Sequence, residues 1–336
     1  MKKLICLMLV AVMAMTVCLV ACEGPGGSEN DLKVAVVLAG ATGDRSFYDS
    51  ANEGLQSLEA AGGVKSMLIE CQNDASMFTA NLISAAENND VVVAVGWEFW
   101  DALEEYAPQL PDTKFIFVDN GLDGVGDNLL SVTYAQNEGS FLVGYIAGKL
   151  TTTGKIGAVG GEDSETINDF IVGYEAGAKY ANPDIQVQTK YADTYDDPAR
   201  GKELALALYD GGCDIIFQVA SRTGEGVFEA AAERKLYAIG VDSDQKYINP
   251  DVIICSMVKQ VGLSIEQTVT ALLDDGTWNG GEIWVADMST GLIGVSYGDD
   301  SMTQQVSDEL KAEVEGIKED IISGKIKVPT AFNSND

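Results

Sequence analysis

The chain has 336 residues, of which 46% are hydrophobic, and carries a formal net charge of −31. A chain of this length and composition buries enough apolar surface for two cores rather than one. The acidic residues are spread along the chain, so they repel nucleic acid and anionic lipid headgroups, and nucleic acid is excluded as a partner.

The N-terminus resembles an export signal. An apolar stretch over residues 4–21 follows two lysines, and such a stretch serves either as a signal peptide or as a short membrane anchor. The letters LVAC at 19–22 resemble the lipobox at which bacterial lipoproteins are cleaved and lipidated. We therefore expect a signal peptide over 1–21, lipidation of Cys22 and a flexible tether over 22–32. The alternative is a signal peptide that contains a chance cysteine.

Short apolar runs alternate with helix-like segments from residue 33 onward. Continuous hydrophobic runs indicate strands of a parallel sheet that is covered on both faces, and the alternation is the βαβ signature. The strands expected in this first half are 33–39, 65–70, 91–95 and 114–119, with helices at 46–61 and 76–88.

The same pattern starts again after a helix expected at 138–150. The second half predicts strands at 155–161, 185–191, 213–220 and 236–242, separated by helices at 174–182, 198–210 and 224–234. A strand at 252–258, a helix at 259–273, two β-rich runs at 281–289 and 291–298 and a helix at about 302–322 complete the chain.

This organisation predicts an α/β fold of two doubly wound parallel-sheet lobes with a ligand cleft between them. Because sequence is left over after both halves, the chain is expected to cross between the lobes more than once. We expect the first lobe to hold 33–136 plus 258–290, and the second lobe to hold 137–257 plus 291–330.

In open parallel sheets, ligands bind beyond the carboxyl ends of the strands. The turns at these ends are 40–55, 96–100, 119–120, 191–198, 219–226 and 240–245, and they repeatedly carry aromatic, short polar and carboxylate side chains. Such groups stack on a ring and accept hydrogen bonds from hydroxyls. Each also has a structural reading: Ser46 as a helix N-cap, Phe47 as a core residue, Asp119 and Asp242 as turn formers.

Catalysis finds little support in the sequence. The chain contains no histidine, which excludes His-dependent nucleophiles and His-ligated metals. No phosphate-binding or dinucleotide-binding glycine motif occurs in the right context, so we expect neither an enzyme nor a cofactor. Asp242 and Asp244 are the best pair for acid/base chemistry. Beyond the signal region, Cys71, Cys213 and Cys255 lie in or beside apolar runs and are expected to be buried thiols, although pairing stays open.

Five segments together resemble the basic membrane protein family of bacterial lipoproteins, the PnrA-like substrate-binding components of ABC importers. They are GDRSFYDSANEGL (43–55), QNEGSFLVGYIAGKL (136–150), FQVASRTGEGVFEAA (217–231), AIGVDSDQ (238–245) and SGKIKVP (323–329). The resemblance implies a type I periplasmic-binding-protein fold that closes on a nucleoside, of the purine class in typical members. It also implies delivery of the ligand to an ABC permease with its ATPase, by a lipid-anchored monomer on the extracytoplasmic face of the cell membrane.

In that family, two aromatic rings sandwich the base, and carboxylate and lysine groups hold the ribose. By resemblance, Phe47 supplies one ring and Tyr195 the other, with Phe170 as its rival. Family members commonly have Asn after the first ring, where this chain has Tyr48. The ligand-binding residues expected from the strand ends and the resemblance are Asp44, Ser46, Phe47, Tyr48, Asp119, Phe170, Tyr195, Arg222, Asp242 and Lys259.

Two of these positions carry more specific expectations. Asp242 and Lys259 match the positions expected to hold the ribose hydroxyls, and Arg222 stands where family members usually have a small residue. An arginine there either contacts an anionic ligand or covers the rim of the cleft. Two alternatives remain open: a sugar or other small polar metabolite as ligand, and a sensing lipoprotein without a transport role.

Overall fold

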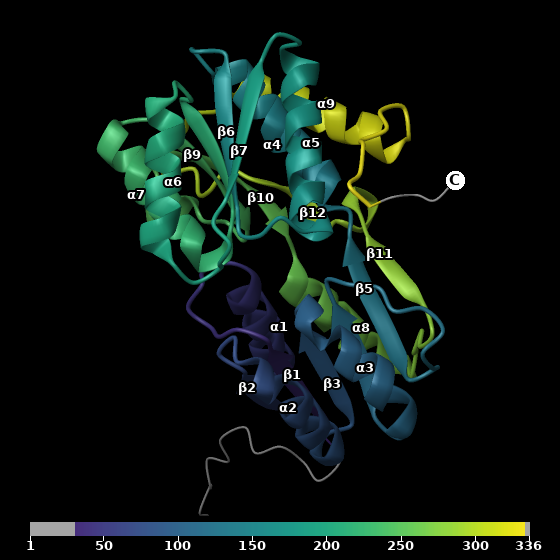
Figure 1. Cartoon of the computed structure of the whole chain (residues 1–336). Helices are drawn as coiled ribbons and strands as arrows, with labels where there is room; N and C mark the ends of the chain where they lie inside the picture. Colours follow the sequence, from purple (N-terminus) through teal and green to yellow (C-terminus); the bar gives the residue numbers. More distant parts are fainter. Residues whose placement is uncertain (1–30, 333–336) are drawn as a thin grey trace, which may run out of the picture.

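The computed structural model describes residues 31–332 (Figure 1). The predicted signal peptide and the lipidation site at Cys22 lie outside the described residues. Within residues 31–332, every helix is too short or too polar to cross a membrane.

The first lobe is built on a six-stranded sheet in which all neighbouring strands are parallel. Its strand order is β11-β5-β4-β3-β1-β2. The strands are β1 (Leu32–Leu38), β2 (Val64–Glu70), β3 (Val91–Val95), β4 (Lys114–Val118), β5 (Leu129–Tyr134) and β11 (Ile283–Ala286). Its helices are α1 (Phe47–Ala61), α2 (Ala75–Asn88), α3 (Trp100–Tyr106) and α8 (Val261–Asp275), of which α8 packs against α1.

The second lobe repeats this plan with the order β12-β10-β9-β8-β6-β7, in which β12 alone runs antiparallel to its neighbour. The strands are β6 (Lys155–Gly160), β7 (Gln186–Tyr191), β8 (Ile215–Val219), β9 (Tyr237–Asp242), β10 (Ile253–Lys259) and β12 (Ile293–Ser296). The helices are α4 (Gln136–Leu150), α5 (Glu165–Ala181), α6 (Pro198–Asp210), α7 (Glu225–Arg234) and α9 (Asp308–Ile322).

The chain passes between the two sheets three times. It crosses from β5 to α4, which packs on α5, then from β10 to α8, and finally from β11 to β12. Two sheets joined in this way confirm the predicted α/β fold of two parallel-sheet lobes. Figure 1 shows the lobes one above the other, with β10 running toward the lower lobe.

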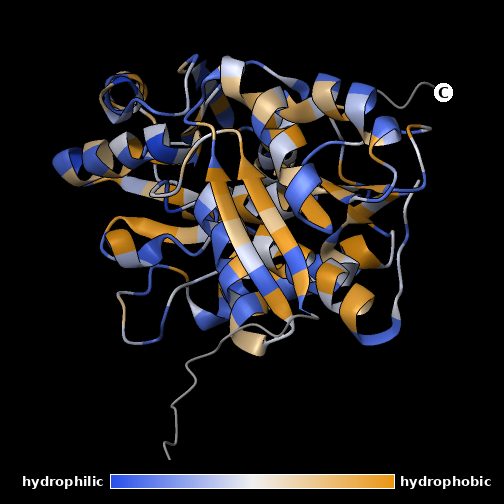
Figure 2. Ribbon diagram, turned by 90° about the horizontal axis from the view of Figure 1, so that it is seen from below, coloured by the Kyte–Doolittle hydropathy of each residue, from blue (hydrophilic) through white to orange (hydrophobic). Residues whose placement is uncertain are grey.

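Burial explains why the strands read as unbroken apolar runs. All five residues of β3 and all five of β8 are buried, because helices cover both faces of each sheet. Figure 2 shows that the helices mix hydrophilic and hydrophobic residues, as amphipathic helices with one covered face do. Cys71, Cys213 and Cys255 are buried free thiols, as expected.

Several elements differ from the sequence prediction, among them the short helix α3, which was not predicted. Strand β5 was not predicted, because the buried Ser131 interrupts its apolar letters; the Ser131 hydroxyl accepts a hydrogen bond from the Leu122 N–H. Helix α5 begins at Glu165, whereas the prediction began at 174 because the first turns of the helix hold polar residues. One of them, Asp169, is buried and accepts hydrogen bonds from Thr330 Oγ1 and the Ala331 N–H. Helix α9 begins at Asp308 rather than about 302.

Candidate functional site

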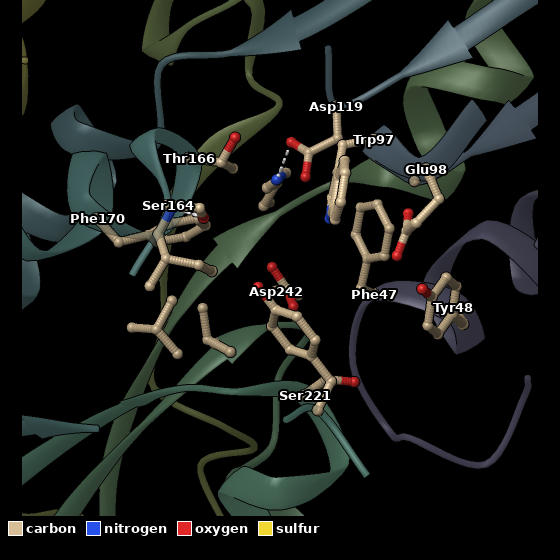
Figure 3. Close-up of a pocket in the computed structure, with 16 residues that line it drawn as sticks. Phe47, Tyr48, Trp97, Glu98, Asp119, Ser164, Thr166, Phe170, Ser221 and Asp242 are labelled. Carbon is tan, nitrogen blue, oxygen red and sulfur yellow. Dashed lines mark hydrogen bonds and ion pairs between the residues drawn. The ribbon is translucent and has the colours of Figure 1, made fainter. Parts of the chain in front are cut away.

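A cavity with about 650 Å³ of empty space, part of it open to solvent, lies between the lobes at the carboxyl ends of their strands (Figure 3). Elements of the first lobe contribute Phe47, Tyr48, Gly96, Trp97, Glu98 and Asp119 to its lining. The second lobe contributes Ser164, Thr166, Ile167, Phe170, Tyr195, Val219, Ser221, Val241, Asp242 and Lys259.

The turn before α1 is held by the carboxylate of Asp44. Its two oxygens accept hydrogen bonds from the backbone N–H groups of Ser46 (3.1 Å), Tyr48 (3.0 Å) and Asp49 (3.0 Å). Asp44 therefore caps the start of the helix in place of the N-cap side chain, and it lies behind the cavity wall. Burial raises the pKa of the Asp44 carboxyl, and the three backbone donors act in the opposite direction.

Ser46 occupies the N-cap position of α1, but its side chain makes no cap hydrogen bond. Its hydroxyl instead donates to Asp242 Oδ2 at 2.6 Å, across the two lobes. Ser46 therefore occupies the N-cap position, as the structural reading predicted, but its hydroxyl does not cap the helix. The contact fixes the position of one carboxylate oxygen of Asp242.

Further polar contacts join the lobes beside the cavity. Ser221 Oγ donates to Asp44 Oδ2 at 2.9 Å, and Gln245 Nε2 donates to the carbonyl oxygen of Arg45 at 3.0 Å. Arg45 also lies 3.7 Å from Glu225, its side chain being half-exposed. These contacts show the cleft in a closed arrangement.

Lys259 ends β10 with its ammonium group inside the cavity wall. The side chain is 2% exposed and pairs with the Asp119 carboxylate, which lies at the end of β4 in the other lobe. The Nζ atom also lies 4.8 Å from the ring centroid of Tyr134 and 5.2 Å from those of Phe47 and Phe170. An ammonium group in this position is attracted by the ring faces and by the carboxylate together.

Asp242 lies at the end of β9 and is 7% exposed. Burial raises the pKa of its carboxyl to about 6, although the charge of Lys259 and the hydroxyl of Ser46 act against burial. The negative charges of Asp119 and Asp44 raise this pKa further. Asp242 is therefore mostly ionised at neutral pH and accepts hydrogen bonds, although its burial makes the charged form cost free energy.

The rings of Tyr48 and Tyr195 reach the cleft because each packs directly on a glycine, where any larger residue would collide with the ring. A Cβ atom on Gly40, just after β1, would come within 2.4 Å of the Tyr48 ring. A Cβ atom on Gly161, just after β6, would come within 2.0 Å of the Tyr195 ring. Because β1 and β6 hold equivalent places in the two sheets, the lobes use the same device to seat an aromatic ring at a strand end.

Non-glycine residues with positive φ are concentrated at the same strand ends. Asp119 (φ 77°), Ser221 (φ 48°) and Asp242 (φ 63°) follow or end β4, β8 and β9, and Arg45 (φ 53°) lies in the opening turn. Non-glycine residues rarely adopt positive φ, and such residues cluster at binding sites, where surrounding contacts hold them. The strain aims carboxylate and hydroxyl groups at the space between the lobes.

The expected site residues divide into three groups by place. Arg222 does not line the cavity: its guanidinium is half-exposed and pairs with Asp196 at 2.8 Å. Asp44 and Ser46 lie behind the wall and hold other site residues in place. The residues that line the cavity are Phe47, Tyr48, Asp119, Phe170, Tyr195, Asp242 and Lys259.

Several lining residues were missed by sequence reasoning. Trp97 and Glu98 lie in the turn after β3, which the strand-end rule selected; Trp97 was considered only as a residue that seals the base of a domain, and Glu98 was not considered. Ser164, Thr166 and Ile167 follow β6, where the same rule would have found them. The alternative acid/base pair gains nothing, because Asp244 does not line the cavity and accepts the Lys246 N–H instead.

Comparison with known proteins places the chain in a family. Residues 31–331 match the family described as ABC transporter substrate-binding protein, PnrA-like. The chain is 32% identical to Basic membrane protein A of Borreliella burgdorferi, over 96% of this chain and 95% of that protein. It is 35% identical to the ABC transporter nucleoside-binding protein BmpA of Lactococcus lactis subsp. cremoris, over 91% of each chain.

Solved structures agree with this placement. The crystal structure of an ABC transporter solute-binding protein from Aeropyrum pernix K1 superposes with a TM-score of 0.80 at 26% identity, covering 90% of this chain and 95% of that one. A Caulobacter myo-inositol binding protein shares the fold alone, with a TM-score of 0.61 at 15% identity over 87% of this chain and all of that one. The two-lobed architecture, the interlobe cavity and the match over nearly the whole described chain lead to one conclusion: the chain belongs to the PnrA-like, basic membrane protein family of ABC transporter substrate-binding proteins, which are not enzymes.

Proposed function

We propose that this substrate-binding protein takes up a nucleoside, of the purine class, in the cavity between its lobes. The observation that carries the proposal is the pairing of aromatic walls with buried charged groups in one cavity. Phe47, Tyr195 and Phe170 offer flat apolar surface, and Asp119, Asp242 and Lys259 offer charges. A planar base with a hydroxylated sugar needs both kinds of surface.

The polar groups suit the hydroxyls of a ribose. A carboxylate accepts hydrogen bonds, and an ammonium group donates them, so Asp242 and Lys259 together match hydroxyls that do both. Each charge-assisted bond of this kind contributes roughly 1.5–3 kcal/mol. The name of the Lactococcus lactis relative, a nucleoside-binding protein, supports the same ligand class for this chain.

We further propose that the protein is held on the extracytoplasmic face of the cell membrane by lipid on Cys22 and delivers its ligand to an ABC permease and ATPase. A lipid anchor keeps a monomeric binding protein near its permease without a spanning helix. Uptake of labelled nucleoside by cells with and without the gene separates this role from sensing, because a sensor would leave uptake unchanged.

Calorimetry tests the ligand class. The polypeptide from residue 23 is unfolded and refolded to remove any bound ligand, then titrated with purine and pyrimidine nucleosides, free bases, ribose and hexoses. We expect tight binding of purine nucleosides and far weaker binding of the free base or of ribose alone. Binding of hexoses alone, or of nothing in this panel, would overturn the proposal.

A further inference from the structure

Glu98 lines the cavity, but its carboxylate is not one of the groups proposed to hold the ribose, which are Asp242 and Lys259. It belongs to the single turn of 3-10 helix Trp97–Phe99 that follows β3, and it lines the cavity with Phe47 and Tyr48. Figure 3 shows its carboxylate next to the rings of these two residues. In the same view the carboxylate of Asp119, which pairs with Lys259, lies apart from that of Glu98.

The local backbone is built to hold this carboxylate at the strand end. Gly96 has φ 122°, and a Cβ atom placed on it would come within 2.4 Å of Glu98 Oε2. The carboxylate therefore folds back over the glycine, into space that a side chain on residue 96 would fill. Ala39, just after β1, closes the other side of that space, 3.0 Å from the same position.

One oxygen of this carboxylate is buried without a partner. Oε2 of Glu98 makes no hydrogen bond to any of the residues 31–332, although it is covered from solvent. A buried carboxylate oxygen without a donor costs free energy, so a native structure normally provides one. Burial raises the pKa of Glu98 to about 7; the backbone N–H of Glu98 itself lowers this pKa, and the charges of Glu162 and Asp119 raise it.

We propose that Glu98 reads the base of the ligand by accepting hydrogen bonds from its N–H groups, which makes a guanine-type base the preferred one. This inference rests on the proposed nucleoside function. The two oxygens of a carboxylate match two adjacent N–H donors, and guanine presents such a pair in its ring N1–H and its exocyclic amino group. Oε2 lies over Gly96, so pairing of both oxygens with the base requires the last side-chain torsion, which is soft, to turn the edge of the carboxylate toward the cavity.

The same chemistry predicts an order among purine nucleosides. Guanosine offers both donors, inosine offers the ring N–H alone, and adenosine presents a bare ring nitrogen at that position. The bare nitrogen cannot pair with the Glu98 carboxylate and accepts a bond only from the protonated carboxyl, so discrimination against adenosine grows as the pH rises above the pKa of about 7. We expect affinity to fall in the order guanosine, inosine, adenosine.

The test compares guanosine with 1-methylguanosine at about pH 8, where the carboxylate form predominates. For the wild type we expect the methyl group to weaken binding by about tenfold or more, because it removes one donor and crowds the other. In Glu98→Gln, guanosine should weaken by about tenfold or more while 1-methylguanosine changes by less than about threefold. Glu104→Gln, which removes an exposed carboxylate from the following helix, should leave both affinities unchanged.

The outcomes separate the two proposals. Equal wild-type affinities for guanosine and 1-methylguanosine, or a preference that survives in Glu98→Gln, would overturn the role of Glu98 and leave the nucleoside function standing. Binding of no nucleoside to the wild type would overturn both. If the variant fails to fold, as judged by its circular dichroism, the wild-type comparison alone decides.

Discussion

Replacing Asp242 with Asn should make the protein bind its ligand less well and resist unfolding better. The carboxyl of Asp242 has its pKa raised from 3.8 to about 6 by burial. The folded state therefore holds this proton more tightly than the unfolded chain does. Ionising the group in the folded state costs about 1.4 kcal/mol for each pKa unit, or about 3 kcal/mol in all.

The sign of the pH dependence follows from the direction of this shift. Below about pH 4, the carboxyl is protonated in both states and contributes no difference. As the pH rises from about 4 to 6, the unfolded chain ionises first, so the free energy of unfolding of the wild type falls relative to that of Asp242→Asn. Above about pH 6 the gap stays constant, with the variant more stable by up to about 3 kcal/mol.

Ligand binding should change in the opposite direction. The amide of Asn carries no charge, so a hydroxyl that donates to this position loses a charge-assisted bond, and affinity falls by about tenfold or more. The hydroxyl of Ser46, which donates to Asp242 Oδ2 at 2.6 Å, retains an acceptor in the amide oxygen of the variant. The variant therefore keeps the interlobe contact while it loses the charge.

Urea unfolding from pH 4 to 8, with calorimetry at pH 8, checks both effects. The control is Asp214→Asn, because Asp214 is also buried but accepts bonds from the Thr152 N–H at 2.7 Å and the Thr153 N–H at 3.1 Å. That variant should lose about 1–3 kcal/mol of stability at pH 8. The reasoning fails if Asp242→Asn is less stable than the wild type at pH 8, or if their gap does not change between pH 4 and 8.

Three further substitutions test one aromatic wall of the site, a matched glycine control and the exposed ion pair of Arg222. Gly161→Ala places a Cβ atom within 2.0 Å of the Tyr195 ring and must displace it, so nucleoside affinity should fall by about tenfold in calorimetry. Gly316→Ala, with nothing within 4 Å, should instead raise stability by about 0.5–1 kcal/mol and leave binding intact. Arg222→Ala removes an exposed ion pair with Asp196, so the free energy of unfolding should change by no more than about 1 kcal/mol and nucleoside affinity should not change. A tenfold loss of affinity in this variant would instead show that Arg222 contacts the ligand.

The sequence predicted the architecture well because its strands are buried on both faces. Residues 91–95 read Val-Val-Val-Ala-Val and form β3 without an exposed side chain, so pattern and structure coincide. The prediction failed where a polar residue is buried with its own partner. Ser131 within β5 and Asp169 within α5 are both buried and hydrogen-bonded, to Leu122 and Thr330 respectively, and both partners lie outside the element that the local pattern describes.

For the site, the strand-end rule located the turns but did not determine which side chains face the cavity. Within one turn, Asp44 points back to cap α1, Ser46 reaches across to Asp242, and Phe47 lines the cavity. These directions depend on a backbone with positive φ at Arg45 and on a partner lobe supplied by residues about 200 positions later. Residue propensities and motif spacing predict neither the positive φ of Arg45 nor the contacts supplied by the second lobe.

Hydrogen bonds and ion pairs join the two lobes of the closed cleft, and a ligand acts together with them. Hydrogen bonds such as those from Ser221 to Asp44 and from Gln245 to the Arg45 carbonyl contribute about 1 kcal/mol each, net of their bonds to water. The Lys259–Asp119 ion pair and the bond from Ser46 to Asp242 also join the lobes, and a ligand in the cavity adds its own contacts to both sides. A ligand that contacts Phe47 on one lobe and Asp242 on the other binds the closed form more tightly than the open one, and that difference shifts the population. In this way, residues on facing strand ends couple ligand binding to closure.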